Sequence, residues 1–246
     1  MDVKGPKILF EIPILGGIPI TETIRNGWFV VIAISIICFF LGRNLSVRNP
    51  SKRQIIAEKL VLTLKNLVEE TMGSHNLYFL PYIGALFSYS ILSSLSGLLG
   101  LRAPTGDLNT TLAFALIAFV LIQFYNIKNN GLVGYIKGFF EPVFFMFPLN
   151  LVGEIANPIS MAFRHFGNIA SGIVITGLIY TALAGLSKVL LGWIPVLGTI
   201  PFFQAGLPAI LSVYFDVFTS FLQAYIISML TMVYVSSANP AKQENN

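Results

Sequence analysis

Four ionisable side chains lie inside long apolar stretches of this sequence, and they are the first candidates for chemistry. Glu154, Arg164 and His165 lie in the first of two long runs near the C-terminus, and Asp216 lies in the second. A charged side chain inside a membrane span is costly, about 2.5–3.5 kcal/mol for arginine at a helix centre on insertion scales. Arginine cannot relieve that cost by losing its proton. These residues are therefore candidates for an ion path, with Arg164 the strongest.

Polar side chains continue from these residues along two helix faces. A spacing of four relates the polar and small residues of the first run, namely Ser160, Arg164, Asn168, Gly172 and Thr176. In the second run one helix face carries Ser212, Asp216, Thr219, Ser220 and Gln223. Close helix packing explains the small residues, but it does not call for an arginine or an asparagine. Two polar faces on neighbouring helices indicate an aqueous or ion path.

Each candidate also has a structural alternative. Arg164 and Asp216 can form a salt bridge that only pins two helices together, and Gln223 can make an interhelical hydrogen bond. His165 points away from Arg164 on a helix and fits a packed, buried histidine. Glu154 can be a solvated residue at a span end. Asp107, in Asp-Leu-Asn-Thr-Thr, is well placed to cap a helix, and Asn126 can cap the end of the same helix.

The composition fixes the class of protein. The 246 residues are 55% hydrophobic and 11% charged, with a mean hydropathy of +0.77, whereas soluble domains are about 25% charged. This excludes ordinary soluble, fibrous and disordered proteins. The net charge of +4 gives no reason to expect a nucleic-acid partner. One cysteine and two histidines in no ligand spacing predict neither a disulfide nor a metal site, and we expect no cofactor.

The apolar runs predict an all-α polytopic membrane protein, because a chain in lipid must satisfy its own backbone hydrogen bonds. We expect one membrane domain over residues 1–246 with about five crossings and a surface amphipathic helix. Its expected parts are an external N-terminal segment (1–26), a first span (27–42), a surface helix (51–70), a helical hairpin (78–101 and 110–127) and a second hairpin (149–191 and 202–237).

The second hairpin is too long for upright spans. Residues 202–237 would form a helix of about 54 Å, whereas the hydrocarbon core is about 30 Å thick. We therefore expect two long, strongly tilted helices that turn at 192–201, with Pro158 and Pro208 as bending points.

Basic residues predict the orientation. Six of the 15 Lys and Arg lie between Arg43 and Lys65, and such clusters stay in the cytoplasm. The N-terminus is then outside, the loop 102–109 is outside, the loop 128–137 is inside and the C-terminus is cytoplasmic.

Four motifs, in order, resemble subunit a of F-type ATP synthases of the bacterial type. They are Pro104-Thr-Gly-Asp-Leu-Asn-Thr-Thr111, Phe147-Pro-Leu-Asn-Leu151 with Glu154, Met161-Ala-Phe-Arg-His-Phe-Gly-Asn168 and Phe221-Leu-Gln-Ala-Tyr225. The resemblance covers about residues 77–237, and the upstream span and surface helix fit the same plan.

The resemblance implies roles by position. Arg164 matches the arginine that meets the carboxylate of the rotating c-ring, and Asn168 and Gln223 match polar residues beside it on the side of ion uptake. Asp216 matches a histidine or carboxylate of relatives. Asp107 and Asn126 match polar positions near the external half-channel, and Glu154, Asn157 and Ser160 lie toward the cytoplasm. Two residues depart from the pattern: His165 replaces a usual leucine, and Ile173 replaces a glutamate or histidine that works with the last helix.

The resemblance implies a non-catalytic, ion-translocating stator subunit with no ATP site of its own. Its expected partners are the c-ring, subunit b of the peripheral stalk, the rest of the F1Fo complex and the bilayer of a bacterial cell membrane. H⁺ is the favoured ion and Na⁺ is possible. The competing hypothesis is a self-contained secondary transporter, but such folds often show internal repeats, and this sequence contains none that we find.

Overall fold

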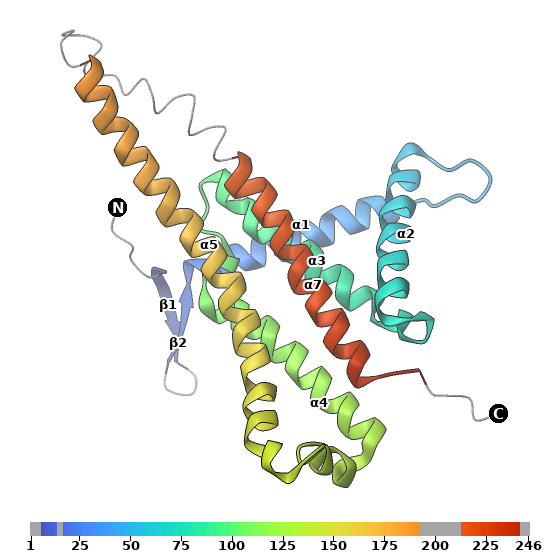
Figure 1. Ribbon diagram of the computed structural model, residues 1–246. Helices are drawn as coiled ribbons and strands as arrows, with labels where there is room; N and C mark the ends of the chain where they lie inside the picture. Colours follow the sequence, from blue (N-terminus) through green and yellow to red (C-terminus); the bar gives the residue numbers. More distant parts are fainter. Residues whose placement is uncertain (1–5, 14–16, 192–212, 242–246) are drawn as a thin grey trace.

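The computed structural model describes residues 6–13, 17–191 and 213–241. Within these ranges the chain is almost wholly helical, and five helices are long and apolar enough to cross a membrane. This confirms the predicted all-α membrane architecture. Figure 1 shows α5 as a long arm that extends beyond the other helices.

The N-terminal segment is more structured than expected, and the first helix begins earlier. Strands β1 (Ile8–Ile12) and β2 (Ile18–Thr21) form an antiparallel hairpin. Helix α1 (Glu22–Gly42) follows at once, because the Thr21 side chain accepts a hydrogen bond from the backbone N–H of Ile24 and caps the helix. The expected first span at 27–42 is therefore extended by one turn or more at its start.

The surface helix and the first hairpin lie close to their expected places. Helix α2 (Lys52–Met72) is capped by Ser51. The chain then forms the 3₁₀ turn η1 (Ser74–Phe79), helix α3 (Leu80–Leu95) and the 3₁₀ turn η2 (Ser96–Leu99), and a further 3₁₀ turn, η3 (Pro104–Gly106), leads to the next helix.

Helix α4 (Leu108–Gly138) runs past the end expected at residue 127. The predicted loop 128–137 is wrong, because these residues continue the helix after a kink at Gly131, whose φ is 69°. Glycine adopts this left-handed conformation without the penalty that a Cβ would bring. The kink turns residues 132–138 back toward the start of α5.

Helix α5 (Phe147–Leu191) follows the 3₁₀ turn η4 (Phe144–Met146) and is continuous through Pro158. Its 45 residues correspond to about 68 Å, twice the hydrocarbon thickness. The last described elements are the π-helical turn η6 (Val213–Phe218) and helix α7 (Thr219–Ala238). The turn expected at 192–201 and Pro208 lie outside the described residues.

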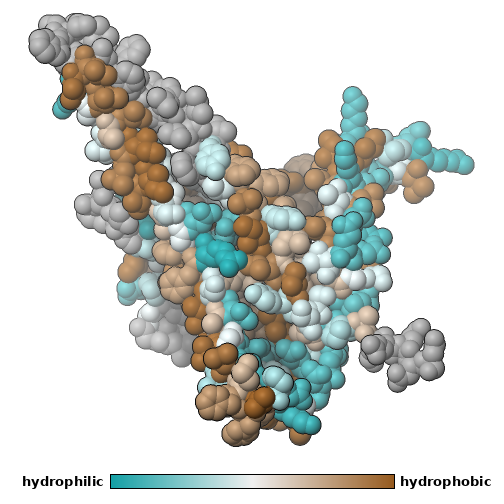
Figure 2. All heavy atoms as spheres, in the orientation of Figure 1, coloured by the Kyte–Doolittle hydropathy of each residue, from teal (hydrophilic) through white to brown (hydrophobic). Residues whose placement is uncertain are grey.

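Two small apolar cores hold the helices together. The first joins Val68 and Met72 of α2 to Ile83 of α3 and Met232 and Val235 of α7. The second is formed by Ala115 of α4, Met161 and Ala162 of α5, and Ile227 of α7. Figure 2 shows that the protruding part of α5 is hydrophobic on the visible face, whereas the visible face of α2 is largely hydrophilic. The second core fixes the middle of α5, where the candidate residues lie.

Candidate functional site

Arg164 lies on the outer side of α5, away from the second core. Ala162 and His165 on either side of it are fully buried, whereas Phe163 and Arg164 are exposed. The guanidinium of Arg164 forms no ion pair with any described residue. An ion pair between described residues joins Arg25 to Glu22 instead. A cation in a helix of this apolar character is an intramembrane ionisable group of the kind that pairs with another charge or faces water, which makes Arg164 a functional candidate.

Asn168, one turn further along α5, is bonded to α7. Its Nδ2 donates to Oε1 of Gln223 at 3.3 Å, and Gln223 is buried with 3% exposure. The interhelical hydrogen bond that the sequence allowed for Gln223 is therefore present. Figure 2 shows a hydrophilic patch between α5 and α7 within a largely apolar surface. This bond fixes two amide groups near Arg164.

On the other side of Arg164 a cavity of about 190 Å³ opens between α4, α5 and α7. Its polar lining includes Asn126 of α4, Glu154 and Asn157 of α5, and Tyr234 of α7, and Met161 lies at its wall. Polar cavities of this size hold water. The cavity reaches within one turn of Arg164.

Glu154 accepts a hydrogen bond from Nε2 of Gln123 at 2.6 Å. The Oε1 of the same amide accepts a hydrogen bond from the hydroxyl of Tyr135, which comes from the part of α4 beyond its kink. Gln123 and Tyr135 were not expected from the sequence. Gln123 could have been singled out as a glutamine near the end of an apolar span. Nothing in the sequence singled out Tyr135.

Asp107 caps α4, as its sequence context predicted. Its Oδ1 accepts from the backbone N–H of Asn109 at 3.1 Å, and its Oδ2 accepts from the hydroxyl of Thr23 in α1 at 2.7 Å. Asp107 is thus anchored between α1 and α4.

The structure does not bring Asp107 together with Asn126, which lies 19 residues further along the chain, or about 28 Å along α4. Asn126 belongs to the Glu154 cavity instead.

His165 lies in the interior, and its ring meets that of Phe114 edge to face at a centroid distance of 6.4 Å. Neither of its ring nitrogens has a hydrogen-bond partner among the described residues.

Ser160 is exposed on α5. The side chains of Asp216 and Ile173, and all of Ser212, lie outside the described residues, so the expected polar face of the last helix is represented by Thr219, Ser220 and Gln223.

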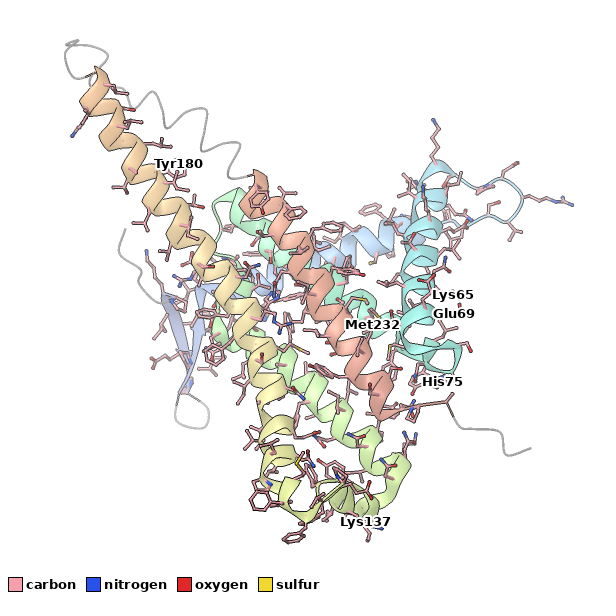
Figure 3. The ribbon with its side chains drawn as sticks, viewed as in Figure 1. Lys65, Glu69, His75, Lys137, Tyr180 and Met232 are labelled. Atoms are coloured by element: carbon pink, nitrogen blue, oxygen red, sulfur yellow. The ribbon has the colours of Figure 1, made fainter. Side chains whose placement is uncertain are left out.

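Figure 3 places Lys65 and Glu69 on α2, Lys137 near the turn from α4 to α5, and Tyr180 far out on α5. No cluster of three or more potential metal ligands occurs in the described part of the chain. Within the described residues, membrane-crossing helices carry a cation that forms no ion pair there, set between a bonded amide pair and a polar cavity. Ionisable groups placed in this way inside membrane spans are typical of an ion-translocating membrane protein.

Comparisons with known proteins identify the family. Residues 26–236 match the family described as ATP synthase A chain. The chain is 31% identical to "ATP synthase subunit a, sodium ion specific" of Propionigenium modestum, over 96% of this chain and 86% of the relative. It is 33% identical to "ATP synthase subunit a 2" of a Bradyrhizobium strain (94% and 93%) and 32% identical to "ATP synthase subunit a" of Moorella thermoacetica (92% and 94%). The chain belongs to the ATP synthase subunit a family and is an ion-transporting part of Fo.

Proposed function

We propose that this subunit provides two offset half-channels to a rotating c-ring and that Arg164 separates them. The observation that carries the proposal is the position of Arg164, exposed on α5 between the Asn168–Gln223 pair and the Glu154 cavity. A cation fixed between two polar regions repels ions that would pass directly from one to the other. The rotor then has to carry them.

The arginine also explains why a rotor carboxylate would exchange its ion here. A carboxylate that faces lipid must be neutral, and a nearby guanidinium favours its charged form. An arriving carboxylate therefore releases its ion near Arg164 and takes up another before it returns to lipid. Each charge that moves through 100 mV supplies about 2.3 kcal/mol, so several ions must cross for each ATP.

The proposed uptake path leads past Asp107, Asp216, Asn168 and Gln223, and the release path leads past Ser160, Asn157, Glu154 and Asn126. The position of Asn126 in the Glu154 cavity supports moving it from uptake to release. We propose H⁺ as the ion, and Na⁺ is the alternative suggested by the sodium-specific relative.

The proposed assembly has the c-ring against the exposed side of α5, with subunit b and the remaining F1Fo subunits completing the complex in a bacterial cell membrane. Exposed apolar side chains flank Arg164 along α5, including Ile155, Ile159 and Phe163. This is the composition expected of a surface that meets the apolar helices of a rotor within the bilayer.

The test compares wild type with Arg164→Ala in proteoliposomes that contain the whole complex. We expect the variant to lose ATP-driven pumping, because a rotor carboxylate no longer meets a cation, and to leak ions passively between the half-channels. Lys188→Ala is the control, since it removes a positive charge from the exposed end of the same helix. Normal pumping without a leak in an intact Arg164→Ala complex would contradict the proposal.

A further inference from the structure

We propose that the connection between α1 and α2 is a binding site for the headgroup of an anionic phospholipid. Its donors are Arg43, Arg48, Lys52 and Arg53, and residues 43–53 are called the basic loop below. The site is separate from the ion path, because none of the residues assigned to the two half-channels lies on α1 or α2.

The basic loop concentrates positive charge that its neighbours do not neutralise. It holds four of the 15 Lys and Arg and no Asp or Glu, so its formal charge of +4 equals the net charge of the whole chain. All four basic side chains are exposed, and none forms an ion pair with a described residue. Glu58, the next acidic residue along the chain, instead accepts a hydrogen bond from Nε2 of Gln54 at 2.7 Å. The four cations are therefore available to an anion from outside the chain.

A buried glutamine gives the basic loop a defined shape. The Oε1 of Gln54 accepts from the backbone N–H of Ser46 at 2.9 Å, and its Nε2 donates to the carbonyl of Ser46 at 3.0 Å. Because a backbone N–H only donates and a carbonyl only accepts, these two bonds determine which way the amide faces. Gln54 is 6% exposed, and its own backbone N–H donates to the Ser51 hydroxyl that caps α2. The segment 46–54 is thereby closed into a loop that carries three of the four basic side chains.

The basic loop begins where a membrane span ends. Helix α1 is long and apolar enough to cross a membrane, and Phe39 and Phe40 near its end are 64% and 55% exposed, as side chains that face lipid are. Arg43 follows Phe40 by three residues, or about 5 Å along a helix axis, which is the distance from the acyl chains to the headgroups. Leu45 is apolar and 62% exposed, which suits the boundary between the two. Figure 1 shows that the connection projects away from the other helices, which leaves it open to the bilayer.

A phosphate group matches these donors. Guanidinium groups bind phosphate oxygens through two parallel hydrogen bonds, and a lysine adds a point charge. Clusters of about four or more basic residues next to a membrane span are typical of sites for anionic lipids, and each basic residue near such a surface strengthens binding about fivefold. A zwitterionic headgroup carries its own ammonium group and gains less from four cations. We therefore expect the loop to select lipids with a net negative headgroup.

A lipid at this site would fix the start of the surface helix. The end of α2 is held by the protein, because Val68 and Met72 pack in the first core. Its start has the basic loop instead. Lipid at the loop and the core at the other end would together hold α2 along the membrane surface.

A photo-reactive residue can identify what contacts the basic loop. p-Benzoylphenylalanine, which is also apolar, replaces Leu45 in the full chain, and the whole complex is reconstituted into vesicles of equal parts phosphatidylglycerol and phosphatidylethanolamine. After irradiation, mass spectrometry of the isolated subunit counts the adducts with each lipid. We expect phosphatidylglycerol adducts to exceed phosphatidylethanolamine adducts about fivefold or more.

Replacing two of the arginines tests the role of the charges. Arg48→Gln with Arg53→Gln should lower the ratio of the two adducts about fivefold or more, toward the composition of the vesicles. Both side chains are exposed, so the complex should still assemble. Lys128→Gln with Lys137→Gln is the matched control, because it removes the same charge from exposed positions on α4. This control should leave the ratio unchanged.

Gln54→Met separates a shaped site from charge alone. All four cations remain while both bonds to Ser46 are lost, so we expect the ratio to fall about twofold or more. An unchanged ratio in this variant would show that the loop is not a built site. Equal adducts of the two lipids in the otherwise wild-type chain, an equal fall in the α4 control, or capture of a protein in place of lipid would overturn the proposal. If Gln54→Met fails to assemble, the arginine pair and its control decide.

Discussion

At the scale of single residues, burial alternates sharply around Arg164. Ala162 and His165 are 0% exposed, whereas Phe163 between them is 55% exposed. The helix therefore separates two neighbouring ionisable groups, with His165 in the core and Arg164 at the surface. Of the two, only Arg164 can meet a partner chain, which argues for a packing role for His165.

Thr23 offers a test of how Asp107 is held. Thr23 is 2% exposed, and its hydroxyl donates to Oδ2 of Asp107 at 2.7 Å. Valine has the same shape without the hydroxyl, so we expect Thr23→Val to destabilise the subunit by about 1.5–3 kcal/mol, the usual size of a bond to a charged group. The measurement is the thermal denaturation midpoint of the purified complex.

The control for this prediction is Thr63→Val on α2, where the hydroxyl is exposed and, within the described part of the chain, donates only to the carbonyl of Lys59. Its midpoint should match wild type. Equal midpoints for both variants would show that the Thr23–Asp107 bond contributes nothing measurable.

Residues whose roles follow from the local sequence were predictable. Residues whose contacts form only because a helix bends back on itself were not. Asp107 caps α4 through the amide two residues later, which its sequence context is sufficient to predict. Tyr135 reaches Gln123 because the helix bends at Gly131 between them. A single glycine in a polar stretch does not specify the direction of a bend, so this contact had no readable signal.

At the scale of helices, α1 and α3 meet closely at one glycine. A Cβ on Gly27 would lie 2.8 Å from the hydroxyl oxygen of Tyr89, closer than real contacts allow. Tyr89 itself is held by an edge-to-face contact with Phe114 at 5.6 Å. A larger residue at 27 must therefore move α1 or the tyrosine.

We expect Gly27→Leu to destabilise the packing of α1 by about 1–3 kcal/mol, as overpacked contacts do. Gly42→Leu is the matched control at the other end of α1, where nothing lies within 4 Å of an added Cβ. The measurement is the amount of subunit retained in the complex after purification in detergent. Equal retention of the two variants would mean that α1 is not held by this contact.

Helix positions were largely predictable because apolar runs must be helical in lipid, but helix ends were not. The start of α1 shifted to Glu22 because Thr21 provides a cap, and α4 continued to Gly138 through a polar stretch that resembled a loop. Pro158 did not break α5. A side-chain cap sets the first of these ends and a glycine kink carries α4 past the second, and hydropathy alone specifies neither.

At the scale of the whole molecule, hydrogen bonds connect the helix ends in two separate groups. The start of α1 bonds to the α3–α4 connection, through Asn26 to the carbonyl of Arg102 at 2.9 Å. The end of α7 bonds to the segment after α2 and to α4, through Asn239 to Asn76 at 2.7 Å and to Asn129 at 2.9 Å. This is the pattern that alternating crossings produce, with α2 and the end of α7 on one side.

The basic residues before and along α2 predict, by the positive-inside rule, that this side is cytoplasmic, and labelling can test this directly. Cys38 is the single cysteine of the chain, so a Cys38→Ser background permits new cysteines to be read one at a time. Val47, fully exposed beyond α1, and Asn109, exposed at the start of α4, lie in the two opposite groups. We expect an impermeant maleimide to label Val47→Cys only in inverted vesicles and Asn109→Cys only in intact spheroplasts. The reverse labelling pattern would mean that the chain has the opposite orientation in the membrane. The Glu154 cavity would then serve ion uptake instead of release.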